Sequence, residues 1–515
     1  MKSLKGVIAA GHTETAEAAT EILRAGGNAF DAAIAAMLTA CVAEPVLASL
    51  GGGGFLTACA KDQPPQLFDF FTHTPKQKRP AEDLDFYPIE ADFGTASQTF
   101  HIGLGSVATP GFIRGLFSIH KHHCQLPLSE LFKPAIERAK NGVAINQFQD
   151  LIATIVAPIL RATPESMMLN RSPADKTRLI SEGERHKQPE LADFLDALQH
   201  EGERLFYNGE AGQSLIKACQ HQGGHLRQED LSDYQVVVRK PLHYTYRDAQ
   251  LYTNPLPSVG GTLIAFALGL IANHTKQTAS MSQGSALRLL ARTMQFTQQV
   301  RQENKLTMAQ ILNPDIAEAY QRKMIEGGLS TRGTTQISIA DAEGNLASMT
   351  LSNGEGCGYI IPNTGIMMNN MLGEEDLNPG GFHQWPEDRR LASMMSPTLI
   401  MSKNGDALVT GSGGSNRIRS AVLQVILNQL DHRMALAEAV SNPRIHFEND
   451  LLSIEPGFDK ALCHDLLDEF QHQQHWKQKN LFFGGAHSVM LDHKGNLSGA
   501  GDERRGGVSR MVYQY

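Results

Sequence analysis

The chain has 515 residues, of which 41% are hydrophobic, with 46 Lys and Arg against 54 Asp and Glu, a formal net charge of −8. This length and composition predict a large buried core and exclude a disordered or collagen-like chain. The negative charge argues against a broad surface for nucleic acid or anionic lipid, and the length corresponds to about three domains of about 150 residues each.

Cysteine usage and the N-terminus bear on where the protein is found. The six cysteines are scattered and none stands in a CxxC pair, which is typical of buried thiols rather than a disulfide framework. The first twenty residues lack the apolar segment of a signal peptide, so we expect a cytoplasmic protein. The most apolar segment, residues 32–43, is shorter than the roughly 20 residues that span a bilayer. We therefore expect no membrane and no nucleic acid among its partners.

The N-terminal third predicts mixed strands and helices. A short apolar run over residues 6–10 precedes a helical repeat over residues 15–25, which Gly26 and its neighbour end as a C-cap. A second helix starts at Asn28 and ends before Pro45, because the residue before a proline disfavours helix.

Further along, glycine and proline mark several loops. Four consecutive glycines at 51–54 indicate a close approach of backbone or a tight turn, and no Lys-Ser/Thr pair follows to make a phosphate loop. Residues 60–100 are polar with prolines and predict irregular surface. Residues 127–142 predict a helix, and residues 160–200 combine dense charge with weak apolar periodicity, which we interpret as solvated helices or a mobile flap. A Pro/Gly-rich loop covers residues 253–262.

The C-terminal third has a different pattern. Three segments, 334–353, 398–413 and 487–502, each consist of a β-rich run, a polar turn with glycine and a second β-rich run, which predicts hairpins. A helical stretch, 417–430, lies between the second and third. Together they indicate an α+β protein with stacked antiparallel strands.

Gly333-Thr334-Thr335, at the start of the first hairpin, is the candidate for chemistry. A threonine hydroxyl is a weak nucleophile unless a base lies beside it, and a threonine at a chain terminus has its own α-amine as that base. The reference pKa of an α-amine, about 7.7–8.0, leaves much of it neutral near neutral pH. An internal Thr334 reaches this state only if the bond after Gly333 is cut.

Two further segments lie at the ends of the predicted hairpins. Residues 352–358, reading SNGEGCG, close the first hairpin and return to the end where Thr334 starts. Residues 411–416, reading GSGGSN, connect the second hairpin to a helix. Consecutive backbone N–H groups in such a turn can bind an oxyanion, and the helix N-terminus assists them.

A series of ordered motifs resembles the γ-glutamyltransferase (glutathione hydrolase) family of N-terminal-nucleophile hydrolases over nearly the whole chain. The motifs are AGGNAFDAA, LGGGGF, TPG, PLPSVGG, GTT, NN, SPT, GSGG and NPR, at residues 25–33, 50–55, 109–111, 255–261, 333–335, 369–370, 396–398, 411–414 and 442–444.

The resemblance implies a fold and a maturation step. The fold is a four-layer αββα sandwich of stacked antiparallel sheets. The precursor cuts itself between Gly333 and Thr334 into a large part, 1–333, and a small part, 334–515, which remain together as a heterodimer. No metal or organic cofactor is needed.

The resemblance also assigns roles in turnover of a small amide. Thr334 attacks the amide and forms an acyl-enzyme, which water or an amine then takes over. Ser352 matches the hydroxyl that orients the nucleophile, and Asn353 falls in the substrate-contacting loop. Gly413 and Gly414 match the pair whose amides hold the oxyanion.

Three positions depart from the family pattern. Phe71 stands where the family has the Arg that grips the donor's α-carboxylate, and phenylalanine cannot replace that bidentate contact. Glu374 stands in place of an Asp that takes the α-amine, and a Ser-Ser pair is reduced to Ser393 followed by Met394. We expect glutathione to be a poor substrate and an amide with a more apolar acyl group near Phe71 to be preferred. The alternatives are an acylase-like relative acting on a non-glutamyl amide and a non-catalytic, ligand-binding homologue.

Other reactive side chains have simpler interpretations. Cys357 near the candidate site is either a reactive thiol or, as we expect, a small apolar filler without a histidine partner. Two arginine pairs, 389–390 and 504–505, are candidates to bind a substrate carboxylate, and we expect surface salt bridges instead.

Overall fold

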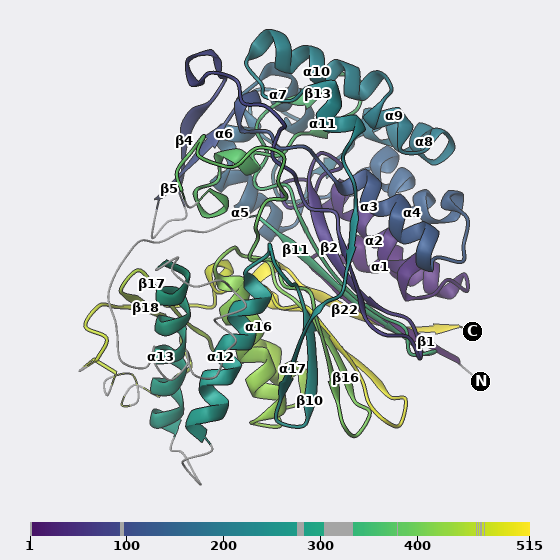
Figure 1. Cartoon of the computed structure of the whole chain (residues 1–515). Coiled ribbons are helices and arrows are strands. Elements are labelled where there is room, and N and C mark those ends of the chain that lie inside the picture. The colour runs from purple at the N-terminus through teal and green to yellow at the C-terminus, as the bar shows by residue number, and fades with distance from the viewer. Residues whose placement is uncertain are drawn as a thin grey trace.

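The computed structural model describes residues 3–92, 97–275, 283–302, 333–378 and 380–514, except 460, 462, 464, 465 and 468. Two antiparallel sheets are stacked and flanked by helices on their outer faces (Figure 1). Among the described helices, none is long and apolar enough to cross a membrane.

The first sheet has seven strands in the order β22-β1-β11-β12-β2-β3-β8. Their bounds are β1 (Ser3–Ala10), β2 (Gly53–Cys59), β3 (Gln66–Asp69), β8 (Val237–Arg239), β11 (Thr335–Asp341), β12 (Leu346–Ser352) and β22 (Val508–Gln514). The expected hairpin over 334–353 is confirmed as β11 and β12, and it occupies the centre of this sheet.

The second sheet has six strands in the order β21-β20-β16-β15-β10-β9. Their bounds are β9 (Leu242–Tyr246), β10 (Ala249–Thr253), β15 (Thr398–Ser402), β16 (Ala407–Thr410), β20 (Ser488–Leu491) and β21 (Leu497–Ala500). The other two expected hairpins are therefore confirmed, and both lie in the sheet opposite the first one.

Helices form the two outer layers. The larger group consists of α1 (Thr13–Arg24), α2 (Ala29–Ala43), α3 (Phe112–His123), α4 (Leu128–Asn141), α5 (Gln147–Ile155), α6 (Ala157–Leu160), α7 (Pro164–Asn170), α8 (Pro189–Glu201), α9 (Arg204–Tyr207), α10 (Glu210–Gln222) and α11 (Gln228–Ser232). The second group is α12 (Gly260–Thr275), α13 (Gln283–Gln302), α16 (Arg417–Leu430) and α17 (Leu436–Ser441). In Figure 1 the two groups lie on opposite sides of the stacked sheets.

Small strand pairs complete the described structure. They are β4 (Tyr87–Asp92) with β5 (Ser97–Ile102), β6 (Val143–Ala144) with β7 (Arg185–His186), β13 (Ile360–Ile361) with β14 (Ile366–Met367), and the three-stranded set β17 (Ile445–Glu448), β18 (Leu451–Ile454) and β19 (Gln473–His475).

Side-chain alternation along the strands separates the apolar layers. In β1, Ile8 and Ala10 join the core beneath α1 and α2, whereas Val7 and Ala9 face the other way into the layer between the sheets. A third apolar cluster lies between the second sheet and α12 and α16. The expected αββα sandwich is thus confirmed, with one core in each of its three interfaces.

The start of α2 confirms the expected helix boundary. Asn28 caps the helix by accepting from the backbone N–H groups of Phe30 and Asp31, and the Asp31 carboxylate accepts from the backbone N–H of Asn28. Every residue of α2 is buried, which explains why its sequence is apolar all round rather than on one face.

Two expectations for surface segments are wrong. Within residues 60–100, β3 is a strand of the first sheet. Its sequence, QLFD, has only two apolar residues between polar and proline-containing flanks, too few to predict a strand. Within residues 160–200, α8 packs against α4 and buries Leu191, Phe194, Leu195 and Leu198. That spacing of i, i+3, i+4 and i+7 marks an amphipathic helix, but the charge of the whole segment conceals it.

Candidate active site

The β11–β12 pairing sets Thr334 beside Ser352. Thr335 lies opposite Leu351, so the residues just beyond them, Thr334 and Ser352, meet at the same end of the hairpin. Both are buried, at 4% and 5% exposure, and both line one pocket. The expected return of the hairpin to the candidate nucleophile is observed.

Hydroxyl groups surround the carbonyl of the peptide bond between Gly333 and Thr334. The Gly333 oxygen accepts from Thr334 Oγ1 at 2.8 Å and from Ser352 Oγ at 2.9 Å. Ser352 Oγ in turn accepts from the N–H of Gly354 at 3.1 Å, which orients its proton toward Gly333. Two donors on one carbonyl draw electron density from its carbon, so this bond is polarised toward attack.

The glycine turn between β16 and α16 packs against the nucleophile. A Cβ on Gly413 would lie 2.1 Å from the Thr334 carbonyl oxygen, so only glycine allows this approach. Gly414 has a φ of +117°, a left-handed conformation that favours glycine. The N–H of Gly413 makes a long 3.4 Å contact to the carbonyl of Gly485. The turn therefore lies where an oxyanion site is expected, with one amide held weakly by Gly485.

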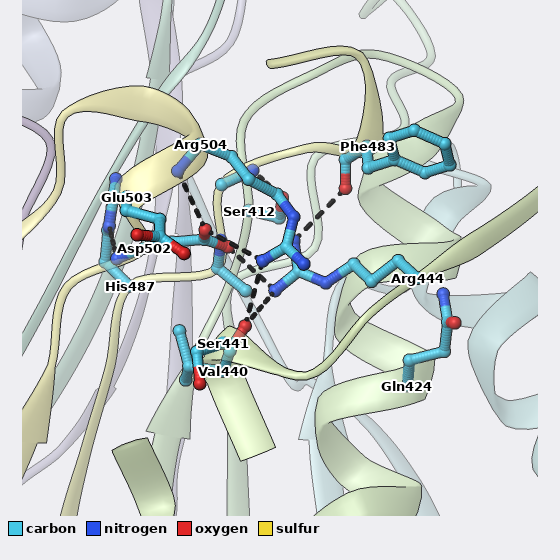
Figure 2. Close-up of polar contacts among 12 residues, drawn as sticks. Ser412, Gln424, Val440, Ser441, Arg444, Phe483, His487, Asp502, Glu503 and Arg504 are labelled. Atoms are coloured by element: carbon cyan, nitrogen blue, oxygen red, sulfur yellow. Dashed lines mark hydrogen bonds and ion pairs between the residues drawn. The ribbon is translucent and has the colours of Figure 1, made fainter. Parts of the chain in front are cut away.

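Figure 2 shows a buried ionic cluster formed by Arg444, Asp502 and Arg504. Arg444 contacts the Asp502 carboxylate at 2.7 Å and Arg504 contacts it at 3.1 Å, while Arg504 also pairs with Glu455. Burial alone would raise the pKa of Asp502, but the two guanidinium groups outweigh burial and hold it well below its usual range. Asp502 Oδ2 also accepts from the N–H of Ala486, so the cluster fixes the segment that contacts Gly413.

The expectation of surface salt bridges is wrong for three of the four paired arginines. Arg504 and Arg505 are buried, and Arg505 donates to the carbonyl oxygen of Thr334 at 3.4 Å. The side chain of Arg390 is 7% exposed, contacts Asp69 at 3.3 Å and donates to the carbonyl of Phe71. Each guanidinium has a partner within the fold, because an unpaired buried charge is costly.

Most of the predicted substrate-contacting residues gather around one narrow pocket. The lining residues are Phe71, Val259, Thr334, Ser352, Met371, Glu374, Asp376, Leu377, Ala392, Ser393, Met394, Met395, Ser415 and Ile418. Of these described residues, none is Lys or Arg. Asn353 is not among them, although it is fully buried in the adjoining loop. The pocket wall is thus mainly apolar, with two carboxylates and several hydroxyl groups.

Phe71 forms a fixed part of this wall. Its ring stacks on Phe55 with ring centroids 5.4 Å apart, and its carbonyl accepts from the Tyr234 hydroxyl at 2.6 Å. The Asp69 carboxylate, two residues before, pairs with Arg239 at 2.8 Å and with Arg390. The guanidinium of Arg390 is therefore bound to Asp69 and is not among the pocket-lining groups.

The paired asparagines and the glycine run hold the loops around the site together. Asn369 Nδ2 donates to the carbonyls of Gly51 and Ala108. A Cβ on Gly52 would lie 2.4 Å from the Ser352 carbonyl oxygen. The expected close approach of backbone at 51–54 is therefore observed, and it brings β2 against the end of β12.

Two buried carboxylates near the nucleophile escaped the sequence interpretation. Glu44 accepts from the hydroxyls of Thr15 and Thr335 at 2.8 and 2.7 Å, and burial raises its pKa. Glu355 accepts from the N–H of Gly333 at 2.8 Å. Glu44 follows a helix in an ordinary way and carries no signal, whereas Glu355 stands between Gly354 and Gly356, a pattern that indicates an unusual turn.

Two further candidates for chemistry are a metal site and the thiol of Cys357. Among the described residues, no group of three or more His, Cys, Asp or Glu side chains could hold a metal ion. Cys357 is 1% exposed, and burial raises the pKa of its thiol to about 12. A neutral, buried thiol fits the expected role of an apolar filler.

Comparisons with known proteins agree with this geometry. The family model described as gamma-glutamyltranspeptidase matches residues 15–512. The glutathione hydrolase proenzyme of Escherichia coli (strain K12) is 27% identical and covers 98% of this chain and 91% of its own length. The acylase ACY 1 proenzyme of Pseudomonas sp. (strain SE83) is 28% identical, covering 98% and 93%.

The overall fold is shared with a solved acylase. The crystal structure of cephalosporin acylase from Bacillus halodurans superposes with a TM-score of 0.85 at 22% identity, covering 99% of this chain and 96% of that one. The likeness confirms the overall αββα fold. With a family model that spans nearly the whole sequence, the chain belongs to the gamma-glutamyltranspeptidase family.

Proposed function

We propose that this enzyme cuts itself between Gly333 and Thr334, and that Thr334 then acts as an N-terminal nucleophile on amides with an apolar acyl group. As a member of its family, the chain is a self-processing hydrolase and transferase. The polarised Gly333 carbonyl beside the Thr334 hydroxyl supports the cleavage site.

Self-cleavage follows from the groups around that bond. Thr334 Oγ attacks the Gly333 carbonyl carbon, the C–N bond breaks, and its nitrogen takes the proton that Oγ loses. Ser352 donates to the carbonyl oxygen as negative charge develops there. Water then hydrolyses the resulting ester, which leaves a carboxylate on Gly333 and a free α-amine on Thr334.

The freed α-amine serves as the base in turnover. With a reference pKa of about 7.7–8.0, it accepts the Oγ proton while Oγ attacks the substrate carbonyl. The amides of Gly413 and Gly414 are proposed to hold the oxyanion, for which the Gly413 N–H would exchange its long contact to Gly485. Water or an amine then releases the acyl group from Thr334.

The two fragments would stay together because they share both sheets. In the first sheet β1 and β2 belong to residues 1–333, whereas the β11 and β12 strands between them belong to 334–515. In the second sheet β10 pairs with β15 across the same division. Separation would expose the apolar layers that these strands form, so we expect a stable heterodimer.

The acyl group is proposed to be apolar, and the observation that carries this proposal is Phe71 in the pocket wall. Phe71 stacks on Phe55 and offers no donor to a carboxylate, which a γ-glutamyl donor would place here. Glu374 and Ser393 also line the pocket and are proposed to contact the polar part of the donor, with Asn353 supporting the same loop. The acylase relative at 28% identity supports this choice.

A γ-glutamyl donor is the second candidate, favoured by the relative named glutathione hydrolase. The test compares kcat/KM for γ-glutamyl-p-nitroanilide and for p-nitroanilides of straight-chain fatty acids. The proposal predicts higher kcat/KM with the fatty acyl series, and a strong preference for the γ-glutamyl compound would contradict it. A wild-type chain that stays uncut and turns over neither substrate would favour the non-catalytic homologue.

A further inference from the structure

We propose that Glu355 is a positioning residue for self-cleavage, holding the N–H of Gly333 so that the carbonyl of Gly333 faces Thr334 and Ser352. This inference rests on the proposed cleavage between Gly333 and Thr334. It adds a role for a carboxylate that contacts Gly333, the residue directly before the cut.

The loop that carries Glu355 is built to place it. Gly354 and Gly356 have φ values of +65° and +91°, conformations that residues with a Cβ rarely adopt. The N–H of Glu355 donates to Asn370 Oδ1 at 3.0 Å, which ties the loop to the paired asparagines. Glu355 is 3% exposed. Its backbone is thus anchored, and its side chain is directed inward.

The contact lies directly before the bond to be cut. Glu355 Oε1 accepts from the Gly333 N–H at 2.8 Å. A Cβ on Gly333 would lie 2.6 Å from the Gly354 carbonyl oxygen, so the glycine is pressed against the same loop. A hydrogen bond to a carboxylate is stronger than one between neutral groups, and here it fixes the rotation of the peptide that leads into Gly333.

An opposite charge holds the other end of the dipeptide. The buried guanidinium of Arg505 donates to the Thr334 carbonyl oxygen at 3.4 Å. The carboxylate at the N–H of Gly333 and the cation at the carbonyl of Thr334 follow the direction of the peptide dipoles between them. Glu355 and Arg505 therefore hold Gly333-Thr334 from both sides while the hydroxyls of Thr334 and Ser352 contact its central carbonyl.

The surroundings of the Glu355 side chain are mostly apolar. Glu355 also lines a narrow cleft whose wall is largely apolar, including Leu50, Leu160 and Ile366. Burying an ionised group against such a wall is costly unless polar partners compensate. The N–H of Gly333 is one such partner, and its hydrogen bond to Glu355 lies directly before the bond to be cut.

The test follows the precursor in time. Wild type, Glu355→Ala, Glu355→Gln and Glu355→Asp are made by cell-free synthesis, and samples are separated on denaturing gels to measure the rate of cleavage. Glu343→Ala is the matched control, because Glu343 is an exposed carboxylate in the turn of the same hairpin. Circular dichroism spectra check that each chain folds.

We expect Glu355→Ala to slow cleavage at least about tenfold, the effect of losing one charge-assisted hydrogen bond. Glu355→Gln keeps an acceptor oxygen at the same reach and should restore much of the rate. Glu355→Asp keeps the charge but withdraws the oxygen, so it should remain slow, and it decides the matter if the alanine variant does not fold. The cleavage rate should fall more than the kcat per cleaved molecule.

The outcomes separate this inference from the proposed function. If wild type cleaves and both Glu355→Ala and Glu355→Asp cleave at its rate, Glu355 has no positioning role, and the proposed function stands. If folded wild type is never cut, the proposed function fails, and this inference fails with it.

Discussion

Replacing Gly413 with alanine tests whether the glycine turn must lie against the nucleophile. The new Cβ would lie 2.1 Å from the Thr334 carbonyl oxygen, whereas carbon and oxygen normally stay about 3.3 Å apart. One of the two backbones must therefore move by about 1 Å. A displacement of that size at a reacting group can cost about 100-fold in rate.

The fold should survive this change, since overpacking costs about 1–3 kcal/mol against a stability of about 5–15 kcal/mol. We expect Gly413→Ala to fold but to cleave itself about 100-fold more slowly than wild type, measured on gels after cell-free synthesis. Gly380→Ala is the control, because the nearest atom to its Cβ is 3.8 Å away. Cleavage of Gly413→Ala at the wild-type rate would refute the reasoning.

Three further changes probe the site and its surroundings. Ser352→Ala removes the 2.9 Å hydrogen bond to the Gly333 carbonyl, which is worth about 1–2 kcal/mol. Self-cleavage, measured on the same gels, should therefore slow about tenfold. An unchanged rate would contradict the role of Ser352. Phe71→Arg introduces a donor into the pocket wall and should raise the ratio of kcat/KM for γ-glutamyl over fatty acyl p-nitroanilides about tenfold, whereas a constant ratio would argue against Phe71 as the selecting residue. Burial lowers the pKa of His487 to about 4, while the unfolded chain takes up this proton near pH 6.5. Stability should therefore be lost as the pH falls from about 6.5 to 4, by up to about 3 kcal/mol from this group. Urea unfolding at pH 7 and 5 should show a smaller pH dependence in His487→Asn, and equal dependence in both proteins would contradict the assignment.

Local patterns in the sequence were enough to predict the parts of the fold whose signals are local. The polar turns around Gly344, Gly405 and Gly495 predicted three hairpins, and the structure has all three. Asn28 marked a helix start because its side chain caps the backbone within three residues. Such signals need no knowledge of distant partners, which is why they can be interpreted from the sequence alone.

The rest depends on partners far apart in the chain. In the sequence, Arg504 looks like an exposed charge beside Glu503. In the structure its side chain is buried and pairs with Glu455, 49 residues away. Arg390 pairs with Asp69 across more than 300 residues. Glu355 likewise contacts Gly333 only because the hairpin folds back. No periodicity reports such pairings, so burial of these charges could not be predicted.

The central claim is that Thr334 becomes a chain terminus, and intact mass spectrometry of the purified protein tests it most directly. We expect two chains, 1–333 and 334–515, the second beginning with the sequence Thr-Thr-Gln-Ile. Thr334→Ala should give one intact chain. A catalytically active wild-type protein that consists only of the uncut 515-residue chain would contradict the account.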